Sequence, residues 1–223
     1  MLTVAWASML VPVDSRDWEV WWIETKHDKD DLAMLHRWGY RQPGRGDTAR
    51  RLIPLYAPRL DADGVPLLDT ARRRVVAEKA QLICDRALER GGVLLVFDEF
   101  QHVVYSRISA GAGVEDVAKR GRGLDVGMMG EVQEPVAVPR LLFSQATHRA
   151  IFGLEHMPDI KIARELNPSY AAGWPRDTDS TVPDRHGFWL RSGPQAGDDN
   201  AWHYWRHVRA WHDAVHKEPA QRS

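Results

Sequence analysis

The sequence predicts an α/β fold in which a parallel sheet carries helices on both of its faces. The apolar run Val93–Phe97 reads as a strand buried on both faces, and it follows the turn signal Gly91-Gly92. Short extended segments alternate with helical ones along most of the chain, which is typical of a doubly wound parallel sheet. The 223 residues, 43% of them hydrophobic, are enough for one sizeable core.

The segments before this run alternate between helical and extended patterns. The longest is a helix closed by Gly91, and its apolar residues recur at helical spacing, which indicates one buried face. We expect Asp69 to cap this helix and Cys84, the one cysteine, to lie in the core. The expected elements are a helix at Leu2–Val11, a strand at Glu19–Glu24, a short helix at Lys29–Trp38 and the long helix at Thr70–Arg90, with Val76, Ala80, Ile83 and Ala87 on its buried face.

The same alternation continues after the central run and then gives way to a different tail. From Asn200 onward, Trp202, Trp205, Val208, Trp211 and Val215 form an aromatic stripe that predicts an amphipathic helix. We therefore expect a core domain over residues 1–190 and a linker with a Trp/His-rich helix over 191–223. The remaining expected elements are a helix at Val114–Arg120, a strand at Val126–Glu131, a helix at Val138–Gln145, a strand at Arg149–Leu154 and a late strand at Gly187–Leu190.

Two adjacent carboxylates, Asp98 and Glu99, follow the central run directly. Ligands of open α/β sheets bind outside the carboxyl ends of the strands, where these acids are expected to lie. In P-loop ATPases an acid pair at this place is the Walker B motif, whose first acid holds the Mg²⁺ shell and whose second orients the attacking water. The alternative is a buried strand that ends in a solvated acidic turn.

Three further segments, in order and spacing, carry a family resemblance. Val126–Glu131 is followed by a Gln before a Pro, as Gln133-Glu134-Pro135, and His148 to Phe152 forms a His-x-x-x-Phe pattern. An earlier strand ends in an acid-x-Lys at Glu24-Thr25-Lys26. With these segments the chain resembles the FtsK/HerA superfamily of P-loop ATPases, the ring-forming DNA and plasmid translocases, over roughly Leu2 to Leu190.

The resemblance implies a role for each matching residue. Asp98 would hold Mg²⁺ through water, and Glu99 would polarise the attacking water. Gln133 would sense the γ-phosphate, although a turn-capping amide is the alternative. Arg122 would be the arginine finger that reaches a neighbouring subunit's nucleotide, with Arg149 as second choice; a surface arginine is the alternative for each. ATP and Mg²⁺ are the implied cofactors, and a homo-oligomeric ring and DNA are the implied partners.

The sequence departs from the family at the phosphate-binding loop. No Gly-x-x-x-x-Gly-Lys-Ser/Thr motif occurs in it, so the chain resembles a family member that begins just after its P-loop. Met1 is then either a misassigned start or the start of a truncated, non-hydrolysing relative. Lys26 lacks the Gly-rich backbone that would let it replace the P-loop lysine. We expect weak or no ATP binding, and an unpaired position in the sheet beside Val93–Phe97.

Composition sets limits on partners and compartment. The formal net charge of −1 gives no bulk attraction to nucleic acid, so any DNA contact would need a local basic patch. A single cysteine fits a reducing, cytoplasmic setting, and no apolar run approaches a membrane span. The His203/His207 and His212/His216 pairs have chelating spacing but lack a completing ligand. The basic candidates are Arg41, Arg45, Arg50 and Arg51 and the run Arg72-Arg73-Arg74, with solvated surface as their alternative reading.

Two functions of different class remain open at this stage. The first is the ATPase domain of a DNA translocase from a phage, plasmid or integrated element, active once an upstream Walker A loop is restored and inactive as written. The second is a non-catalytic module with an ATPase-like fold that binds or scaffolds partners.

Overall fold

The structure is a computed structural model, and it divides into two compact units, residues 1–145 and 146–223, each described by itself. This division falls earlier than the boundary at 190 that the sequence predicts, because the strand that begins at Arg149 pairs with later strands rather than with the main sheet. The described residues are 16–25, 29–44, 49–57, 60, 62–66, 68–154, 156–167, 188–191 and 203–205.

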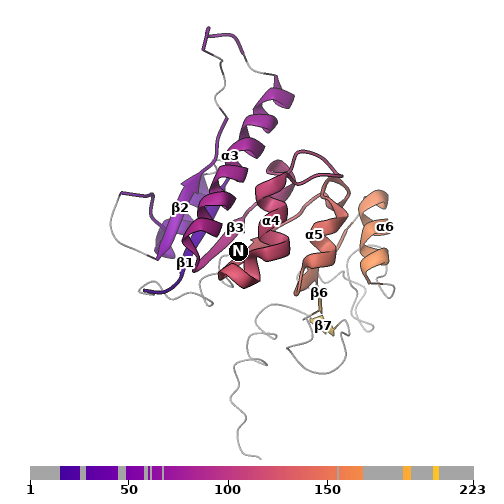
Figure 1. The fold of residues 1–223 in the computed structure, drawn as a ribbon. Coiled ribbons are helices and arrows are strands. Elements are labelled where there is room, and N and C mark those ends of the chain that lie inside the picture. Colours follow the sequence, from indigo (N-terminus) through magenta and orange to yellow (C-terminus); the bar gives the residue numbers. More distant parts are fainter. Residues whose placement is uncertain are drawn as a thin grey trace, which may run out of the picture. The chain divides into compact units, whose positions relative to one another are not determined.

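A four-stranded parallel sheet forms the centre of the first unit (Figure 1). Its strand order is β2-β1-β3-β4, and every neighbouring pair is parallel. The strands are β1 (Glu19–Glu24), β2 (Arg50–Pro54), β3 (Val93–Phe97) and β4 (Val126–Gly130). The predicted α/β class and the interior position of Val93–Phe97 are therefore confirmed. The expected unpaired position beside this strand is wrong, because β1 and β4 pair with it on both sides.

Each face of the sheet has its own hydrophobic core, which explains why β1 and β3 are buried along their whole length. Trp21 and Ile23 of β1 belong to one cluster, whereas Val20 and Trp22 belong to the other. This alternation follows from the two-residue period of side chains along a strand. A strand covered on both faces must be apolar throughout, and the uninterrupted run of β3 meets that requirement.

Helices cover both faces, as a doubly wound sheet requires. The first core receives side chains from α3 (Asp69–Arg90), α4 (Ala112–Arg120) and α5 (Arg140–Gln145), while α2 (Lys29–Arg37) packs on the second through Leu35. The predicted stripe of α3 is confirmed, with Ala80 and Ala87 fully buried. Cys84 is also fully buried, and burial raises the pKa of its thiol to about 12.

One expected helix cap is wrong. Asp69 is the first residue of α3 itself, and Leu68 occupies the capping position with extended backbone and no side-chain cap hydrogen bond. The carboxylate of Asp69 instead lies 3.4 Å from Nη1 of Arg72, one turn along the helix. An acid in the first turn still interacts favourably with the helix dipole.

Short 3₁₀ turns connect several of these elements in the first unit. They are η1 (Phe100–His102) after β3, η2 (Gly121–Leu124) before β4 and η3 (Pro135–Ala137) before α5. The turn η1 is the one that shapes the candidate site, since it begins directly after Glu99.

The second unit contains an antiparallel sheet with the order β5-β6-β7 and the helix α6 (Met157–Leu166). Its strands are β5 (Arg149–Ile151), β6 (Phe188–Arg191) and β7 (His203–Trp205). Two sequence expectations are corrected here. The strand at Arg149 pairs antiparallel with β6 instead of joining the parallel sheet, and the start of the predicted tail helix is a strand, because His203–Trp205 pairs with β6.

Other expectations fall outside the described residues. These are the helix at Leu2–Val11, Lys26, Arg45, the histidines at 207, 212 and 216, and the continuation of the tail beyond Trp205. Among the helices that the structure describes, none is long and apolar enough to cross a membrane.

Candidate functional site

Acidic residues gather at the carboxyl ends of β1 and β3. Ile23 and Phe97 are partners in the parallel register, so Glu24 and Asp98 leave adjacent strands at the same level. Glu24 is fully buried, and Asp98 and Glu99 are each 7% exposed. Buried carboxylates require hydrogen-bond partners, because burial otherwise penalises their charge heavily.

Asp98 is held by the residue that follows the neighbouring strand. The hydroxyl of Thr25 donates a hydrogen bond to Oδ1 of Asp98 over 2.9 Å. This contact joins the ends of β1 and β3 and fixes the carboxylate of Asp98 at the sheet edge. A hydroxyl beside a carboxylate presents hard oxygen atoms, which suit the water shell of Mg²⁺.

Glu99 is held by its own turn. Its Oε2 lies 2.8 Å from Nδ1 of His102, and its carbonyl oxygen accepts a hydrogen bond from the backbone N–H of His102. Phe100 fixes the turn to the core, because its ring packs edge-on against that of Phe97 with 5.1 Å between the ring centroids. Gly130 lies so close that a Cβ there would be 2.9 Å from the Phe100 ring. Glu99 therefore has a fixed position beside Asp98.

Glu24 is a third acid of this edge, which the sequence places at a strand end but which was not among the predicted site residues. The hydroxyl of Tyr56 donates a hydrogen bond to Oε2 of Glu24, and the ammonium of Lys79 donates to the carbonyl oxygen of Tyr56. The signal was present in the sequence, since Glu24 ends a predicted strand just as Asp98 follows one. What the sequence does not show is that the two strands are neighbours in register.

Gln133 is brought to the same edge of the sheet. Its backbone N–H lies 3.4 Å from Oε1 of Gln101, a residue of the η1 turn next to Glu99, and its side chain is exposed. Glu131, two residues earlier, pairs its backbone with Phe97 and Phe100. The turn after β4 is therefore attached to the turn after β3, so Gln133, Asp98 and Glu99 lie within one part of the molecule.

Arg122 lies elsewhere. It belongs to η2, which precedes β4, and so it sits at the amino ends of the parallel strands, opposite the acids. Its side chain is exposed. Arg149 belongs to the second unit. The structure thus gives neither arginine a place beside Asp98 and Glu99 within the first unit.

A second polar arrangement occupies the amino ends of the strands. Glu19 accepts hydrogen bonds from Trp21 Nε1 at 2.6 Å, Arg51 Nη2 at 2.8 Å and Arg90 Nη2 at 2.9 Å. Burial alone would raise the pKa of Glu19, but the hydrogen bonds from Arg51 and Trp21 and the charges of Arg51 and Arg90 outweigh it and hold this pKa below its usual value.

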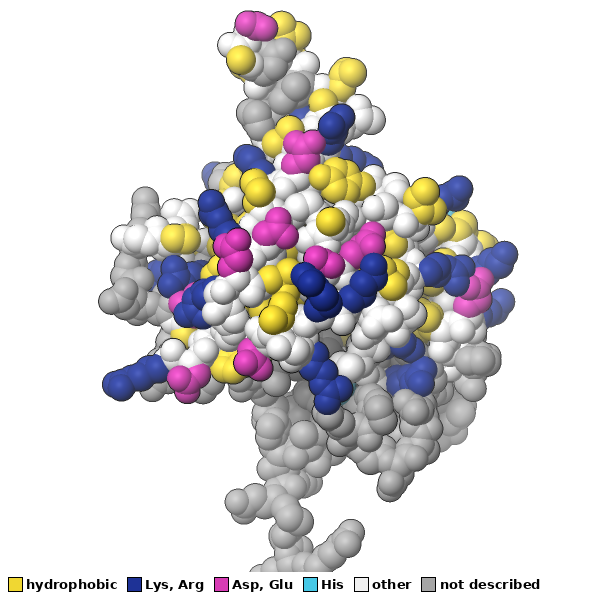
Figure 2. All heavy atoms as spheres, in the orientation of Figure 1, with side chains coloured by type: hydrophobic (Ala, Val, Ile, Leu, Met, Phe, Trp, Pro, Cys, Tyr) yellow, Lys and Arg dark blue, Asp and Glu magenta, His cyan; other side chains and the backbone are white. Residues whose placement is uncertain are grey.

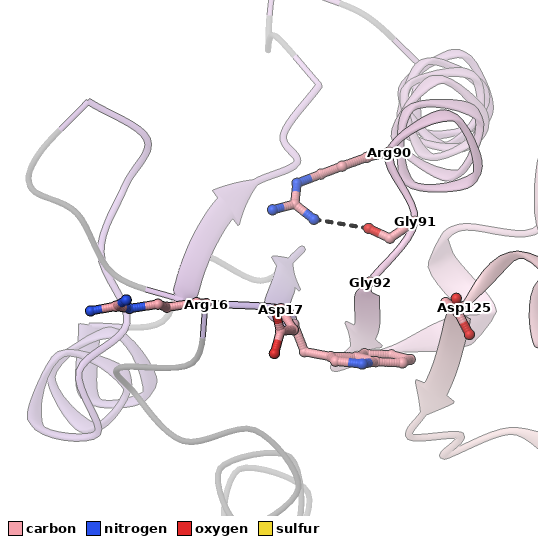
Figure 3. A pocket seen from close by; sticks show the side chains of 7 residues that line it. Arg16, Asp17, Arg90, Gly91, Gly92 and Asp125 are labelled. Carbon is pink, nitrogen blue, oxygen red and sulfur yellow. Dashed lines mark hydrogen bonds between the residues drawn. The ribbon is translucent and has the colours of Figure 1, made fainter.

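An open cavity of about 690 Å³ adjoins this arrangement (Figure 3). Arg90 points across it and donates to the carbonyl oxygen of Gly91 over 2.8 Å. The cavity lies at the opposite end of the strands from Asp98, so it adds nothing to the acidic edge. Its lining is Arg16, Asp17, Trp18, Arg90, Gly91, Gly92 and Asp125.

The basic clusters that were candidates for a DNA contact, with solvated surface as the alternative, are largely engaged within the chain. Arg41 and Arg50 donate to carbonyl oxygens at the end of α2, and Arg51 binds Glu19. Arg72 and Arg74 lie beside Asp69 and Glu78. Figure 2 shows acidic and basic side chains interspersed on the face it presents. These contacts favour a structural reading of the clusters that the structure describes.

The acidic edge offers hard oxygen ligands and a proton acceptor. Asp98 with Thr25 can hold the water shell of a divalent cation, and Glu99 can accept a proton from a water molecule. No group of three metal-ligating side chains occurs among the described residues, so such a cation would bind mainly through water or a ligand. The 223 residues contain no Gly-rich loop with a lysine of the kind that holds phosphates in P-loop proteins.

Comparisons with known proteins show likeness in structure only. No protein-family model matches the sequence, and no curated protein matches it. The genome packaging NTPase B204 from Sulfolobus turreted icosahedral virus 2, in complex with ATP-gammaS, matches with a TM-score of 0.47 and 10% identity over 86% of this chain and 98% of that chain. B204, the DNA-packaging ATPase from Sulfolobus Turreted Icosahedral Virus, matches with a TM-score of 0.46 and 12% identity, and the match covers 86% of this chain and 98% of that chain.

Proposed function

We propose that this chain is an ATPase-like domain related to the FtsK/HerA DNA translocases of phages, plasmids and other mobile elements, and that its acidic edge is the metal-and-water half of a hydrolytic site. The observation that carries the proposal is that Asp98 and Glu99 follow β3 at the carboxyl edge of one parallel sheet, where the turn that carries Gln133 is attached to the turn after β3. Sites in open α/β sheets lie at this edge. In this proposal the chain would assemble with identical subunits into a ring that acts on DNA.

Each side chain has a defined task in this proposal. Asp98, fixed by Thr25, orients the water shell of a divalent cation. Glu99, fixed by His102, receives a proton from a water molecule, for which its burial and rigid turn are suited. ATP would bring the phosphates that complete the metal site, but their recognition requires a loop that the 223 residues do not contain.

The metal half of the site can be tested directly. Mn²⁺, a paramagnetic substitute for Mg²⁺, is titrated into the chain and followed by electron paramagnetic resonance. Because Asp98 is the carboxylate assigned to the water shell of the cation, Asp98→Asn should weaken Mn²⁺ binding by at least about tenfold. Asp116→Asn, which removes a partly exposed acid of α4, is the matched control and should leave Mn²⁺ binding unchanged. Equal Mn²⁺ affinity in both variants would refute the proposed site.

We expect this chain to bind the nucleotide itself weakly or not at all. Each charge-assisted hydrogen bond to phosphate that the missing loop would make is worth roughly 1.5–3 kcal/mol. Calorimetry with MgATP should therefore show weak binding or none. Micromolar affinity would reveal a phosphate site of a different kind and would contradict this part of the proposal.

A non-catalytic binding or scaffolding module is the second candidate. It is favoured by the absent phosphate loop and by the contacts that Thr25, His102 and Tyr56 make with the three acids, which suit a rigid structural edge. If Mn²⁺ binding does not depend on Asp98, the module is the better description.

A further inference from the structure

β4 is an edge strand, and its backbone groups divide between two sides. In a parallel pair, the N–H and C=O groups of one residue point to the same neighbour, and successive residues alternate between neighbours. The carbonyl oxygen of Asp125 accepts a hydrogen bond from β3, and the N–H of Glu131 donates one to β3. The odd-numbered residues between these two contacts therefore bond to β3. The even-numbered ones, Val126, Met128 and Gly130, point their N–H and C=O groups outward.

No strand that the structure describes pairs with this outer side, because the sheet order ends at β4. A row of unpaired backbone groups is a template for a further strand, and edge strands are usually blunted by charged side chains, proline or a bulge. β4 reads Val-Gly-Met-Met-Gly and carries no charged side chain and no proline. Its register with β3 is uninterrupted, so no bulge turns the edge away.

The opposite edge of the same sheet shows the protection that β4 lacks. β2 carries Arg50 and Arg51 and ends in Pro54. Its outer backbone is also engaged, since the N–H of Arg41 donates to the carbonyl oxygen of Arg50 over 3.0 Å, and the carbonyl oxygen of Arg41 accepts from Leu52 over 2.8 Å. The sheet is therefore closed to further strands at β2 and open at β4.

We propose that β4 is the surface through which two copies of this chain associate, with their β4 strands paired antiparallel about a two-fold axis at Met128. The outward residues are symmetric about Met128, so this axis pairs Met128 with itself and Val126 with Gly130 of the second copy. Each such pair exchanges two N–H···O hydrogen bonds. The contact is self-complementary, as a two-fold interface requires.

A second copy fits this edge in charge as well as in backbone pattern. β4 has no charged side chain, so two copies meet along it without like-charge repulsion. Asp125 has φ of +54°, so the chain leaves the strand direction there, and pairing ends at Val126. A two-fold contact joins only two copies, so it is separate from the ring proposed above and does not depend on that function.

Size-exclusion chromatography with light scattering on the full chain, over a range of concentrations, tests the contact. The unmodified chain should be a dimer at the higher concentrations. Met128→Pro should weaken dimerisation by at least about tenfold, because it removes an outward N–H from each copy. The pairing of β3 with β4 keeps its hydrogen bonds, since proline is tolerated where the N–H of an edge strand faces away from its neighbour. Met128→Ala, which loses the same side chain but keeps the N–H, is the matched control and should dimerise within about threefold of the unmodified chain.

Amide hydrogen exchange on the unmodified chain gives a second readout that requires no variant to fold. The N–H groups of Met128 and Gly130 should be protected in the dimer and should exchange faster on dilution. Those of Gly127 and Met129, which bond to β3, should stay protected at every concentration.

A chain that stays monomeric at every concentration would overturn the proposal, whether the outward N–H groups exchange rapidly or are covered by another segment of the same chain. A dimer that Met128→Pro leaves unchanged would place the contact on another surface and would overturn it as well. Asp98→Asn should leave dimerisation intact, so a failure of this contact and a failure of the acidic edge are told apart.

Discussion

Glu99 is the residue on which the proposed hydrolytic chemistry depends, and it can be tested in a chain lengthened at its amino end by a phosphate-binding loop. There Glu99→Gln should lose at least about a hundredfold in steady-state ATP turnover and keep nucleotide binding, because the amide retains the shape but cannot accept a proton. Glu89→Gln, which removes an exposed acid of α3, is the control. Turnover within about threefold of the unmodified protein would exclude Glu99 as the base.

Glu19 offers a test of stability at the opposite edge of the sheet. Glu19→Gln should reduce the free energy of unfolding at pH 7 by about 1–3 kcal/mol, the lower part of this range being expected because Arg51 and Arg90 are partly exposed. The folded-state pKa of Glu19 is lowered, so its stabilisation is present above the unfolded pKa of about 4.3 and is lost as the pH falls through the folded value.

Urea unfolding at a series of pH values measures this effect of Glu19. The free energy of unfolding should differ between the unmodified chain and Glu19→Gln by a constant amount near neutral pH, and this difference should shrink in the acid range. Glu78→Gln removes a carboxylate whose partner Arg74 is largely exposed, and should cost less than about 1 kcal/mol at any pH. If Glu19→Gln lowers the free energy of unfolding by the same amount at every pH, the ionised carboxylate of Glu19 is not the cause of the stabilisation.

Single residues also show where prediction from the sequence ends. Asp98 and Glu99 were predicted because an apolar run makes the strand end visible within a few residues. The partner of Asp98 is Thr25, 73 positions away in the chain, and nothing in either local pattern connects them. Such a contact depends on strand order and register, which local patterns leave open.

At the scale of elements, the turn that leads into β3 explains a glycine requirement. Gly92 has φ of +61°, and a Cβ there would lie 2.3 Å from the carbonyl oxygen of Asp17. Gly92→Ala should therefore destabilise the fold by about 3 kcal/mol or more, through backbone strain and a clash with backbone. Gly64→Ala, with φ of +78° and no atom within 4 Å, should cost only the strain, about 1 kcal/mol.

Thermal or urea unfolding of both variants separates the clash from the strain. Gly123→Ala adds a third reference, because that position has open space and an ordinary φ. Equal losses for Gly92→Ala and Gly64→Ala would mean that the chain before β1 moves aside, and the close approach of Asp17 would then not be a constraint.

A helix or strand could be predicted from the sequence where its own residues show a clear local pattern of apolar side chains. β3 and α3 matched the sequence because a five-residue apolar run and a long helical stripe are locally unambiguous. β5 has three residues, and its direction is set by its partner β6, which comes much later in the chain. The aromatic stripe of the tail was taken as helical, yet His203–Trp205 satisfies its backbone by pairing with β6.

At the scale of the whole molecule, the two units make a prediction about folding. Both cores of the parallel sheet lie within residues 1–145, whereas the small cluster of Ile151, Ile160 and Ala163 belongs to the second unit. A fragment of residues 1–145 should therefore fold alone and unfold cooperatively, because it retains every strand pair of the parallel sheet.

A fragment of residues 1–190 is the matched comparison, since it ends where the sequence alone predicts the boundary. This fragment cuts β6 before Arg191 and removes β7, so β5 loses part of its partner. Circular dichroism melting and size-exclusion chromatography with light scattering should show that 1–190 melts no higher than 1–145 and associates more, because incomplete strand pairing exposes an edge. Cooperative melting of 1–190 together with failure of 1–145 to fold would mean that the parallel sheet needs the residues after 145, and that the units are not independent.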